Sequence, residues 1–297
     1  MRKVFINIIE KNKIIQLLPF LLPPLLIYVA IEGSAVIGMF NISFQEWKNG
    51  LFNYVGLLWY KNIFQDRYLW IATYNTIRWL AISETWAVIF PFGIALLLSQ
   101  KLKGDTFFKG VFIIPQSIGF TAAGLMWSTI YSPDAGILNI FLRILGLERL
   151  THSWLGDPDF AIYCLIFAQI WMRTGFYMMI YLVGLQSLSK EVLEASMVDG
   201  VNFWQRLIYI IVPLMRRSFI VVVSLDLISV LTTFDIVATT TRGGPGVSTE
   251  VLGTRIYKAA FEYWELGYSA ALATALFVLS MIITIIYLNI VVKDQEL

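Results

Sequence analysis

The stretch that decides the fold spans residues 188–214 and reads LSKEVLEASMVDGVNFWQRLIYIIVPL. Ser189 stands where the cap of a helix start is expected. Apolar residues recur at helical spacing on both sides of Gly200, at Leu193, Met197 and Val201, and then at Phe203, Leu207, Ile210 and Ile211 up to Pro213. This pattern predicts two amphipathic helices joined at Gly200. Such an element lies on a membrane or docks into the groove of a partner.

Outward from this stretch, the composition is that of a membrane protein. The 297 residues are 58% hydrophobic and 14% charged, with a mean hydropathy of +0.72. A soluble domain carries about 25% charged residues and about 45–50% apolar ones. Because the apolar residues come in long blocks, the chain is expected to cross the bilayer several times.

Six blocks are long enough to span a bilayer, which takes roughly 20 mostly apolar residues. They are Ile14–Met39, Ile71–Ser99, Phe107–Tyr131, Phe160–Gly184, Ser218–Thr241 and Gly267–Val292. The first block is longer than the apolar core of a signal peptide, which is about 7–15 residues, so we expect a retained helix. The predicted fold class is therefore all-α, with six transmembrane helices.

The distribution of basic residues predicts the orientation. The density of Lys and Arg in segments 1–13, 99–110, 186–217 and 293–297 is about twice that in segments 41–70, 131–159 and 241–266. The positive-inside rule then places both termini, and the 186–217 segment, in the cytoplasm.

Several functions are excluded or disfavoured. The formal net charge is only +2, which gives no nucleic-acid footprint. A single cysteine, Cys164, and a single histidine, His152, allow no disulfide and no metal cluster built on these residue types. There is no G-x-x-x-x-G-K-S/T motif, so the chain has no nucleotide-binding loop of its own, and no motif of a membrane-embedded hydrolase.

The segment from Glu194 to Pro213 resembles the EAA loop of the permeases of binding-protein-dependent ABC importers. That pattern is roughly E-A-A-x-x-D-G-A, then nine or so residues, then I-x-(L or V)-P. The spacing fits without a gap, and Ser196 and Val201 are the departures.

The resemblance continues through much of the chain. Phe107–Pro115 is similar to the start of the family's third helix, and 133–139 to the turn after it. Gly243-Gly244-Pro245 and Gly267–Ala271 look like the fifth loop and last helix of the carbohydrate permeases, such as those for maltose and glycerol-3-phosphate.

The resemblance implies a type I ABC importer permease: residues 1–70 as an N-terminal helix and extracytoplasmic loop, and 71–297 as a five-helix core with the coupling loop at 186–217. It implies a transporter of two different permeases, two ATPase subunits that hold ATP and Mg, and an extracytoplasmic solute-binding protein in a bacterial or archaeal inner membrane. The chain itself would need no cofactor and perform no catalysis. The residues implied in ATPase coupling are Glu194, Ala195, Ser196, Asp199 and Gly200, with Glu194 and Asp199 capping or bonding the turn.

An ungapped alignment anchored on the EAA segment also implies a substrate site near the bilayer midplane. It falls on Gln169, Met172, Arg173, Phe176, Asp226, Ser229 and Val230. Most of these side chains differ from those of the maltose permease, so the location carries over but the specificity does not.

Ionisable residues inside predicted spans are functional candidates, because a charge in the bilayer is costly. They are Glu32, Arg78, Glu84, Arg173, Asp226 and Asp235. Arg173 either binds an acidic sugar through its planar guanidinium or pairs with Asp226 or Glu84 inside the bundle. The alternatives to a sugar permease are an ABC permease for a non-sugar solute and a secondary transporter that uses Glu84 or Asp226 for ion coupling.

Overall fold

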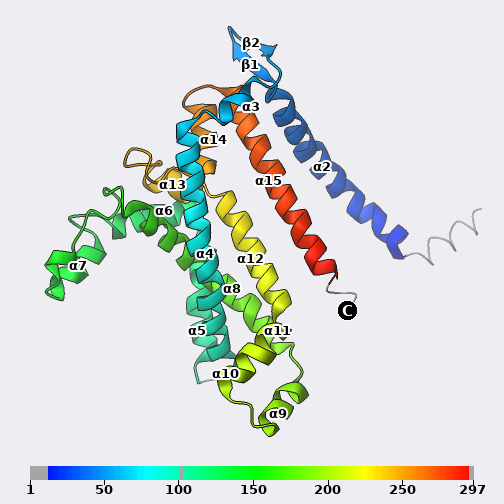
Figure 1. Ribbon diagram of the computed structural model, residues 1–297, viewed down its shortest axis with the longest axis vertical. Coiled ribbons are helices and arrows are strands. Elements are labelled where there is room, and N and C mark those ends of the chain that lie inside the picture. The colour runs from blue at the N-terminus through cyan, green and yellow to red at the C-terminus, as the bar shows by residue number, and fades with distance from the viewer. Residues whose placement is uncertain (1–12, 101–102, 294–297) are drawn as a thin grey trace, which may run out of the picture. The chain divides into compact units, whose positions relative to one another are not determined.

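A computed structural model describes residues 13–100 and 103–293 of the chain (Figure 1). Arg2, Lys3 and Lys11, which contribute to the predicted inside charge, lie outside this range. The predicted all-α class is confirmed apart from one short hairpin. Contacts group the described residues into two units, one built from the chain up to Phe64 with Ala259–Ala275, the other from Gln65–Lys258 with the chain from Leu276 onward.

The first unit contains the helix α2, Lys13–Ile42, which covers the first predicted span. A hairpin of β1, Gln45–Lys48, and β2, Leu51–Tyr54, follows, and the short helix α3, Leu58–Ile63, comes after it. The hairpin was not predicted. Its signal was Asn49-Gly50, whose φ values of 55° and 78° suit a tight two-residue turn.

The second unit contains the remaining helices, except that α14 and α15 are shared with the first. Its long or paired helices are α4 (Arg67–Ser99), α5 (Asp105–Ile113), α6 (Phe120–Ile130), α8 (Ala161–Gln186) and α12 (Arg216–Leu231). Its shorter ones are α7 (Ile137–Ile144), α9 (Lys190–Val198), α10 (Phe203–Arg206), α11 (Val212–Leu214) and α13 (Asp235–Thr240). The shared helices are α14 (Leu252–Phe261) and α15 (Leu266–Lys293).

Four helices are long and apolar enough to cross a membrane by themselves: Pro19–Ile42, Arg67–Ser99, Ala161–Gln186 and Leu266–Ile286. Two further spans are bent pairs, Asp105–Ser117 with Phe120–Ile130, at 101°, and Phe203–Leu214 with Arg216–Leu231, at 69°. Counting each bent pair as one span gives the six that the sequence predicts.

The third predicted span is bent, and the fifth has other bounds than predicted. At Pro115 the ring removes a backbone donor, and α5 gives way to a 3₁₀ turn, Ile114–Ser117, before the extended Gly119. The fifth predicted span, Ser218–Thr241, ends early at Leu231, where the hydroxyls of Thr232 and Thr233 donate to backbone carbonyls one turn earlier and the helix stops.

Helix α8 is the centre of the second unit. It packs against α4, α5, α6 and α12, and more than half of its side chains are buried. The N-terminal half of α8 joins a core around Trp79, Trp127 and Leu165. Its C-terminal half joins a second core around Phe92 and Tyr181. The predicted burial of Cys164 as a small apolar residue is confirmed.

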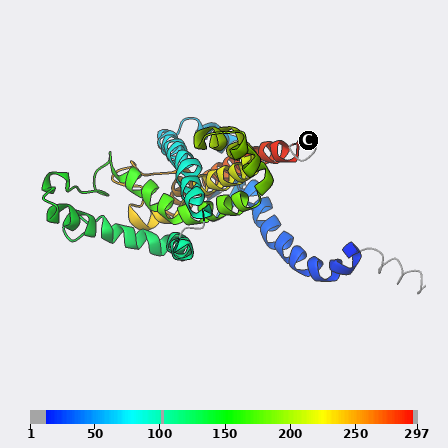
Figure 2. The ribbon, with the colours of Figure 1, turned by 90° about the horizontal axis from the view of Figure 1, so that it is seen from below.

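An arm of residues 131–160 joins α6 to α8 and carries α7 away from the α4–α8–α12 bundle (Figures 1 and 2). Asn139, which is 1% exposed, holds the arm together. Its side-chain amide donates to the carbonyl oxygens of Pro133 and His152, each at 2.9 Å, and its oxygen accepts from Trp154 Nε1 at 2.8 Å.

The loop that carries Gly243-Gly244-Pro245 is held against α4. The buried amide of Asn75 donates to the carbonyl oxygens of Ser248 at 3.0 Å and Glu250 at 2.9 Å. Arg78 in turn donates to Asn75 Oδ1 at 2.8 Å, and its guanidinium lies 5.3 Å from the ring centres of both Tyr74 and Tyr163.

Ion pairs add to this attachment. Asp66 caps α4 and accepts from Arg255 at 2.6 Å, while the buried Glu250 pairs with Lys258 at 2.9 Å. These low-exposure, hydrogen-bonded pairs tie the ends of the loop to α4 and α14.

Gly175 generates a testable prediction about packing. A Cβ atom added there would lie 1.8 Å from the carbonyl oxygen of Phe112, so α8 touches the backbone of α5 at this point. Replacing Gly175 with Ala should destabilise the protein by about 1–3 kcal/mol through overpacking. Thermal unfolding of the purified protein in detergent checks this. Gly93→Ala on α4, where a Cβ would meet nothing within 4 Å, is the matched control, and equal melting of the two variants would contradict the prediction.

Candidate functional site

The stretch at 188–214 folds as predicted into two helices around Gly200. Ser189 Oγ accepts a hydrogen bond from the backbone N–H of Val192 at 3.5 Å, which confirms the predicted cap of α9. Gly200 has φ of 74°, which glycine adopts without the strain that a side chain brings. The N–H of Val201 then donates to the carbonyl of Ser196, as in a glycine-terminated helix.

The second helix begins at a cap that the sequence analysis missed. Asn202 and Gln205 form a capping box, in which each side chain accepts from the backbone N–H of the other residue, at 2.8 and 3.0 Å. The N-x-x-Q spacing was the available signal. Helix α10 then continues through a π-helical turn, Leu207–Ile211, into α11.

Asp199 is the C-cap residue of α9 and its backbone N–H donates to the carbonyl of Ala195, but the side chains of Glu194 and Asp199 form no hydrogen bond to the turn among the described residues. Within the described residues, the turn's hydrogen bonds come from the backbone and from the Asn202–Gln205 box. Ser196 is buried, and its hydroxyl donates to the carbonyl of Leu193 at 2.7 Å, a hydrogen bond within α9.

The outer face of α9 is free and partly apolar. Val198 is 88% exposed and Val192 is 45% exposed, and Glu194 and Ala195 are exposed beside them. We call α9, its Gly200 turn and α10 the coupling element. Its α9 face is a rigidly capped surface with apolar side chains that nothing in the chain covers among the described residues.

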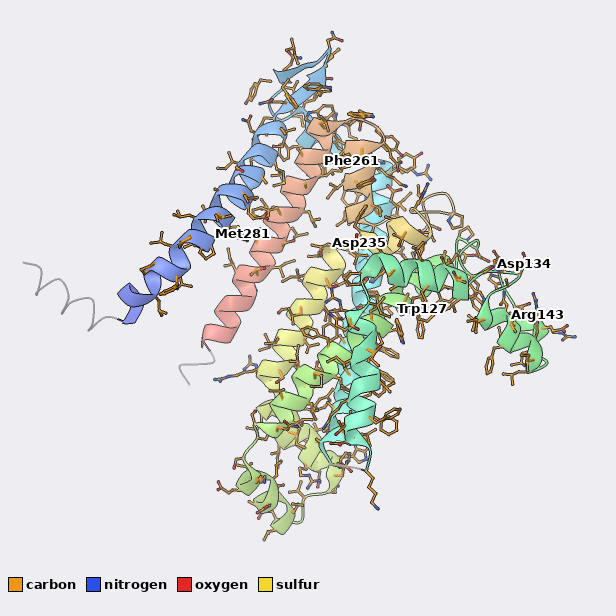
Figure 3. The ribbon with its side chains drawn as sticks, turned by 180° about the vertical axis from the view of Figure 1, so that it is seen from behind. Trp127, Asp134, Arg143, Asp235, Phe261 and Met281 are labelled. Carbon is orange, nitrogen blue, oxygen red and sulfur yellow. The ribbon has the colours of Figure 1, made fainter. Side chains whose placement is uncertain are left out.

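A polar cavity of about 110 Å³ lies beside α8, between the start of α6 and the end of α12. It is lined by Phe120, Gln169, Arg173, Ser229 and the segment Thr232–Ile236. Gln169 donates to Ser229 Oγ at 3.1 Å and accepts from Thr233 Oγ1 at 3.2 Å. Figure 3 shows Asp235 where α12 ends and Trp127 on the neighbouring α6.

The structure brings together three of the seven predicted substrate residues. Gln169, Arg173 and Ser229 line the cavity. The other four do not line it. Met172 and Val230 are buried. Phe176 packs against the core around Phe92 and Tyr181, and Asp226 is buried beside Tyr177.

Thr232, Thr233, Phe234 and Asp235 line the cavity but were not predicted to bind substrate. The signal was the polar run Thr-Thr-Phe-Asp inside an apolar block. It marks a helix interruption, and within a membrane such interruptions are tolerated only where they are buried in protein or line a cavity.

Arg173 is available to bind a ligand. Its guanidinium carbon lies 5.0 Å from the centre of the Phe120 ring, and its Nε has no hydrogen-bond partner among the described residues. The predicted alternative, a salt bridge to Asp226 or Glu84, is absent from the described chain. A planar guanidinium stacked on a ring and facing a polar cavity is suited to a carboxylate, sulfate or phosphate.

A second polar group lies deeper in the bundle. Tyr177 donates to Asp226 Oδ1 at 3.0 Å, and Ser83 lies beside the same carboxylate. Glu84 is within electrostatic range of Asp226, and neither of its oxygens has a hydrogen-bond partner within the described residues. Asp226 is 1% exposed, so its role is tied to the packing of α4, α8 and α12.

Comparison with known proteins places the chain in one family. Residues 87–293 match the family described as binding-protein-dependent transport system inner membrane component. The trehalose/maltose transport system permease protein MalF of Thermococcus litoralis is 32% identical over 80% of this chain and 79% of its own length. The sulfoquinovosyl glycerol transport system permease protein SmoG of Agrobacterium fabrum is also 32% identical, over 80% of this chain and 77% of its own length.

A solved structure has the same fold. It is a chain of a bacterial ABC transporter involved in the import of the acidic polysaccharide alginate, with a TM-score of 0.79 and 20% identity. The match covers 96% of this chain and 97% of that chain. The predicted type I ABC importer permease fold is thereby confirmed.

The buried contact between Tyr177 and Asp226 generates a prediction. Tyr177→Phe leaves the carboxylate without this donor, which should cost roughly 1–3 kcal/mol of stability. Thermal unfolding in detergent measures it. Tyr163→Phe, on the exposed face of the same helix, should be close to neutral, and a Tyr177→Phe variant as stable as that control would show that Asp226 does not depend on the hydroxyl.

Proposed function

This chain belongs to the family of binding-protein-dependent transport system inner membrane components, and we propose that it is the permease subunit of an ATP-driven importer for an oligosaccharide or sugar derivative. An extracytoplasmic binding protein delivers the substrate, and the chain moves it by alternating access. The chain performs no covalent chemistry.

The observation that carries the proposal is the coupling element. Active transport requires energy, and the sequence contains no nucleotide-binding loop. The energy must then enter through a docking surface. The capped α9 with its exposed Val192 and Val198 is a surface of the right kind, because an amphipathic helix binds by laying its apolar side chains into a groove.

Each predicted coupling residue has a role in this proposal. Glu194, Ala195 and Asp199 are exposed and contact the ATPase subunit, while Ser196 is buried on the side of α9 that faces its own chain. Gly200 sets the angle between α9 and α10. A movement of the ATPase subunit is thereby passed through α10 and α11 to α12, which lines the polar cavity.

The substrate contacts the polar cavity through Gln169, Arg173 and Ser229. At about 110 Å³ the cavity is smaller than the roughly 300–1,000 Å³ of sites that enclose a whole ligand. We therefore propose that it holds one group of the substrate and that a second, different permease supplies the rest of the site.

An acidic substrate group at Arg173 is the finer part of the proposal. The relatives named for trehalose/maltose and for sulfoquinovosyl glycerol support a carbohydrate, and the transporter with the same fold imports an acidic polysaccharide. The stacked guanidinium, whose Nε has no hydrogen-bond partner among the described residues and which forms no salt bridge there, supports a negatively charged group on that carbohydrate.

The assembly consists of two permeases, two ATPase subunits that hold ATP and Mg, and the binding protein. It lies in the inner membrane, with both termini of this chain in the cytoplasm. The coupling element is then on the cytoplasmic side, and the arm at 131–160 on the opposite side.

Replacing Arg173 with Gln tests the acidic substrate. A charged hydrogen-bond partner contributes about 1.5–3 kcal/mol, so uptake of an acidic oligosaccharide into ATP-loaded proteoliposomes should fall roughly 10- to 150-fold. Uptake of a neutral oligosaccharide, if it occurs, should change little. Arg143→Gln, on the arm far along the chain from the cavity, removes the same charge and should leave both rates unchanged. Equal uptake by Arg173→Gln and the wild type would remove the acidic group from the proposal.

Gly200 tests the coupling role. A side chain at φ of 74° is strained by about 1–2 kcal/mol, although the site has open space around it. We expect Gly200→Val to assemble with the ATPase subunits but to lose most of the ATP hydrolysis stimulated by loaded binding protein. Gly200→Asn should retain more, because Asn adopts this conformation readily. Full stimulation in Gly200→Val would contradict the role assigned to the turn.

A further inference from the structure

A large cavity lies between the coupling element and the ends of three helices of the second unit. Its volume is about 980 Å³. Its walls come from the end of α4, the start of α5, the end of α8, and α9 and α10 of the coupling element. The polar cavity of the substrate site has none of these residues in its lining.

One part of the cavity wall is apolar. Leu96 of α4, Leu188 after α8, and Leu193 and Phe203 of the coupling element all line it. Phe203 is 47% exposed and stands at the start of α10, none of whose residues is buried. The wall is therefore suited to a hydrocarbon chain.

The other part of the wall is positively charged. Lys109, Lys190 and Arg206 line it, with Asp105 as the single carboxylate among the lining residues. Asp105 pairs with Lys109 at 2.7 Å, so these two charges cancel. Lys190 and Arg206 form no salt bridge within the described part of the chain. The cavity therefore presents two uncompensated cations beside an apolar wall.

The cavity also lies at the ends of two helices that are long and apolar enough to span a membrane. Helix α4 ends at Ser99 and α8 ends at Gln186, and both ends border it. In the proposed topology this is the surface of the cytoplasmic leaflet. Basic pockets between transmembrane helices on that side are suited to anionic lipid headgroups.

We propose that the cavity binds one anionic phospholipid of the cytoplasmic leaflet, with its phosphate between Lys190 and Arg206 and an acyl chain along Leu96 and Leu193. The orientation rests on the proposed function. Lys190 and Arg206 belong to α9 and α10, whereas Leu96 belongs to the long helix α4. A lipid that contacts all three therefore connects the coupling element to the membrane-embedded helices. Anionic lipid thus supports the coupling of ATP hydrolysis to transport.

The test is native mass spectrometry of the intact transporter, released from nanodiscs that contain equal amounts of phosphatidylglycerol and phosphatidylcholine. The wild type should retain phosphatidylglycerol in preference. Each charge removed should weaken retention about fivefold, so the Lys190→Gln/Arg206→Gln double variant should lose most of it.

Two control variants accompany this test. Lys190→Arg/Arg206→Lys, which keeps both charges, should retain the lipid. Lys103→Gln, an exposed lysine that is not among the lining residues, should behave as the wild type.

Three results would overturn the lipid site. They are equal retention of phosphatidylglycerol by the double variant and the wild type, equal retention of the two lipids by the wild type, and protection of Lys190 from an amine reagent by the ATPase subunit with no lipid retained. The last would assign the cavity to that subunit.

ATP hydrolysis by the same preparation separates this inference from the proposed function. Hydrolysis stimulated by loaded binding protein, without selective lipid retention, removes only the lipid site. If no ATPase subunit is present in the purified assembly, the proposed function itself fails, whatever lipid the chain retains.

Discussion

The structure depends on the need to satisfy every backbone polar group inside the bilayer. Helices meet this need by themselves, and interruptions are possible only where protein or a polar cavity receives the freed groups. The first bent pair is interrupted near Pro115–Gly119, and α12 ends at Leu231 before α13 begins at Asp235; residues next to both of these points line the polar cavity. The candidate substrate site is therefore where the chain's two helix breaks meet along α8.

Helix α8 makes this meeting possible because it is packed on several sides. Gly175 allows α5 to approach its backbone, and Gln169 bonds to Ser229 and Thr233 on the other bent span. Arg173 lies on the same helix and faces Phe120 at the start of α6. The buried helix α8 thus contacts α5 and α6 as well as α12 and Thr233, and these contacts hold them in place.

The two ends of the second unit are built differently. On the side of the Gly243–Pro245 loop, Asn75, Arg78 and the Glu250–Lys258 pair hold the chain through buried hydrogen bonds and ion pairs. At the other end, the coupling element has good caps but borders a large cavity and exposes apolar side chains. At the first end, these polar groups are bonded within the chain. At the other end, apolar side chains and a cavity are exposed, which fits the proposed binding of an ATPase subunit and a lipid.

The local features of this protein were predictable from its sequence. The apolar blocks, the Ser189 cap and the turn at Gly200 all follow from residues within a few positions of one another, and the structure confirms them. The split of the seven substrate candidates and the Asn75 attachment were decided only by the tertiary structure. They depend on how each helix is rotated and on contacts between residues far apart in the chain, such as Asn75 and Glu250, which hydropathy and periodicity do not encode.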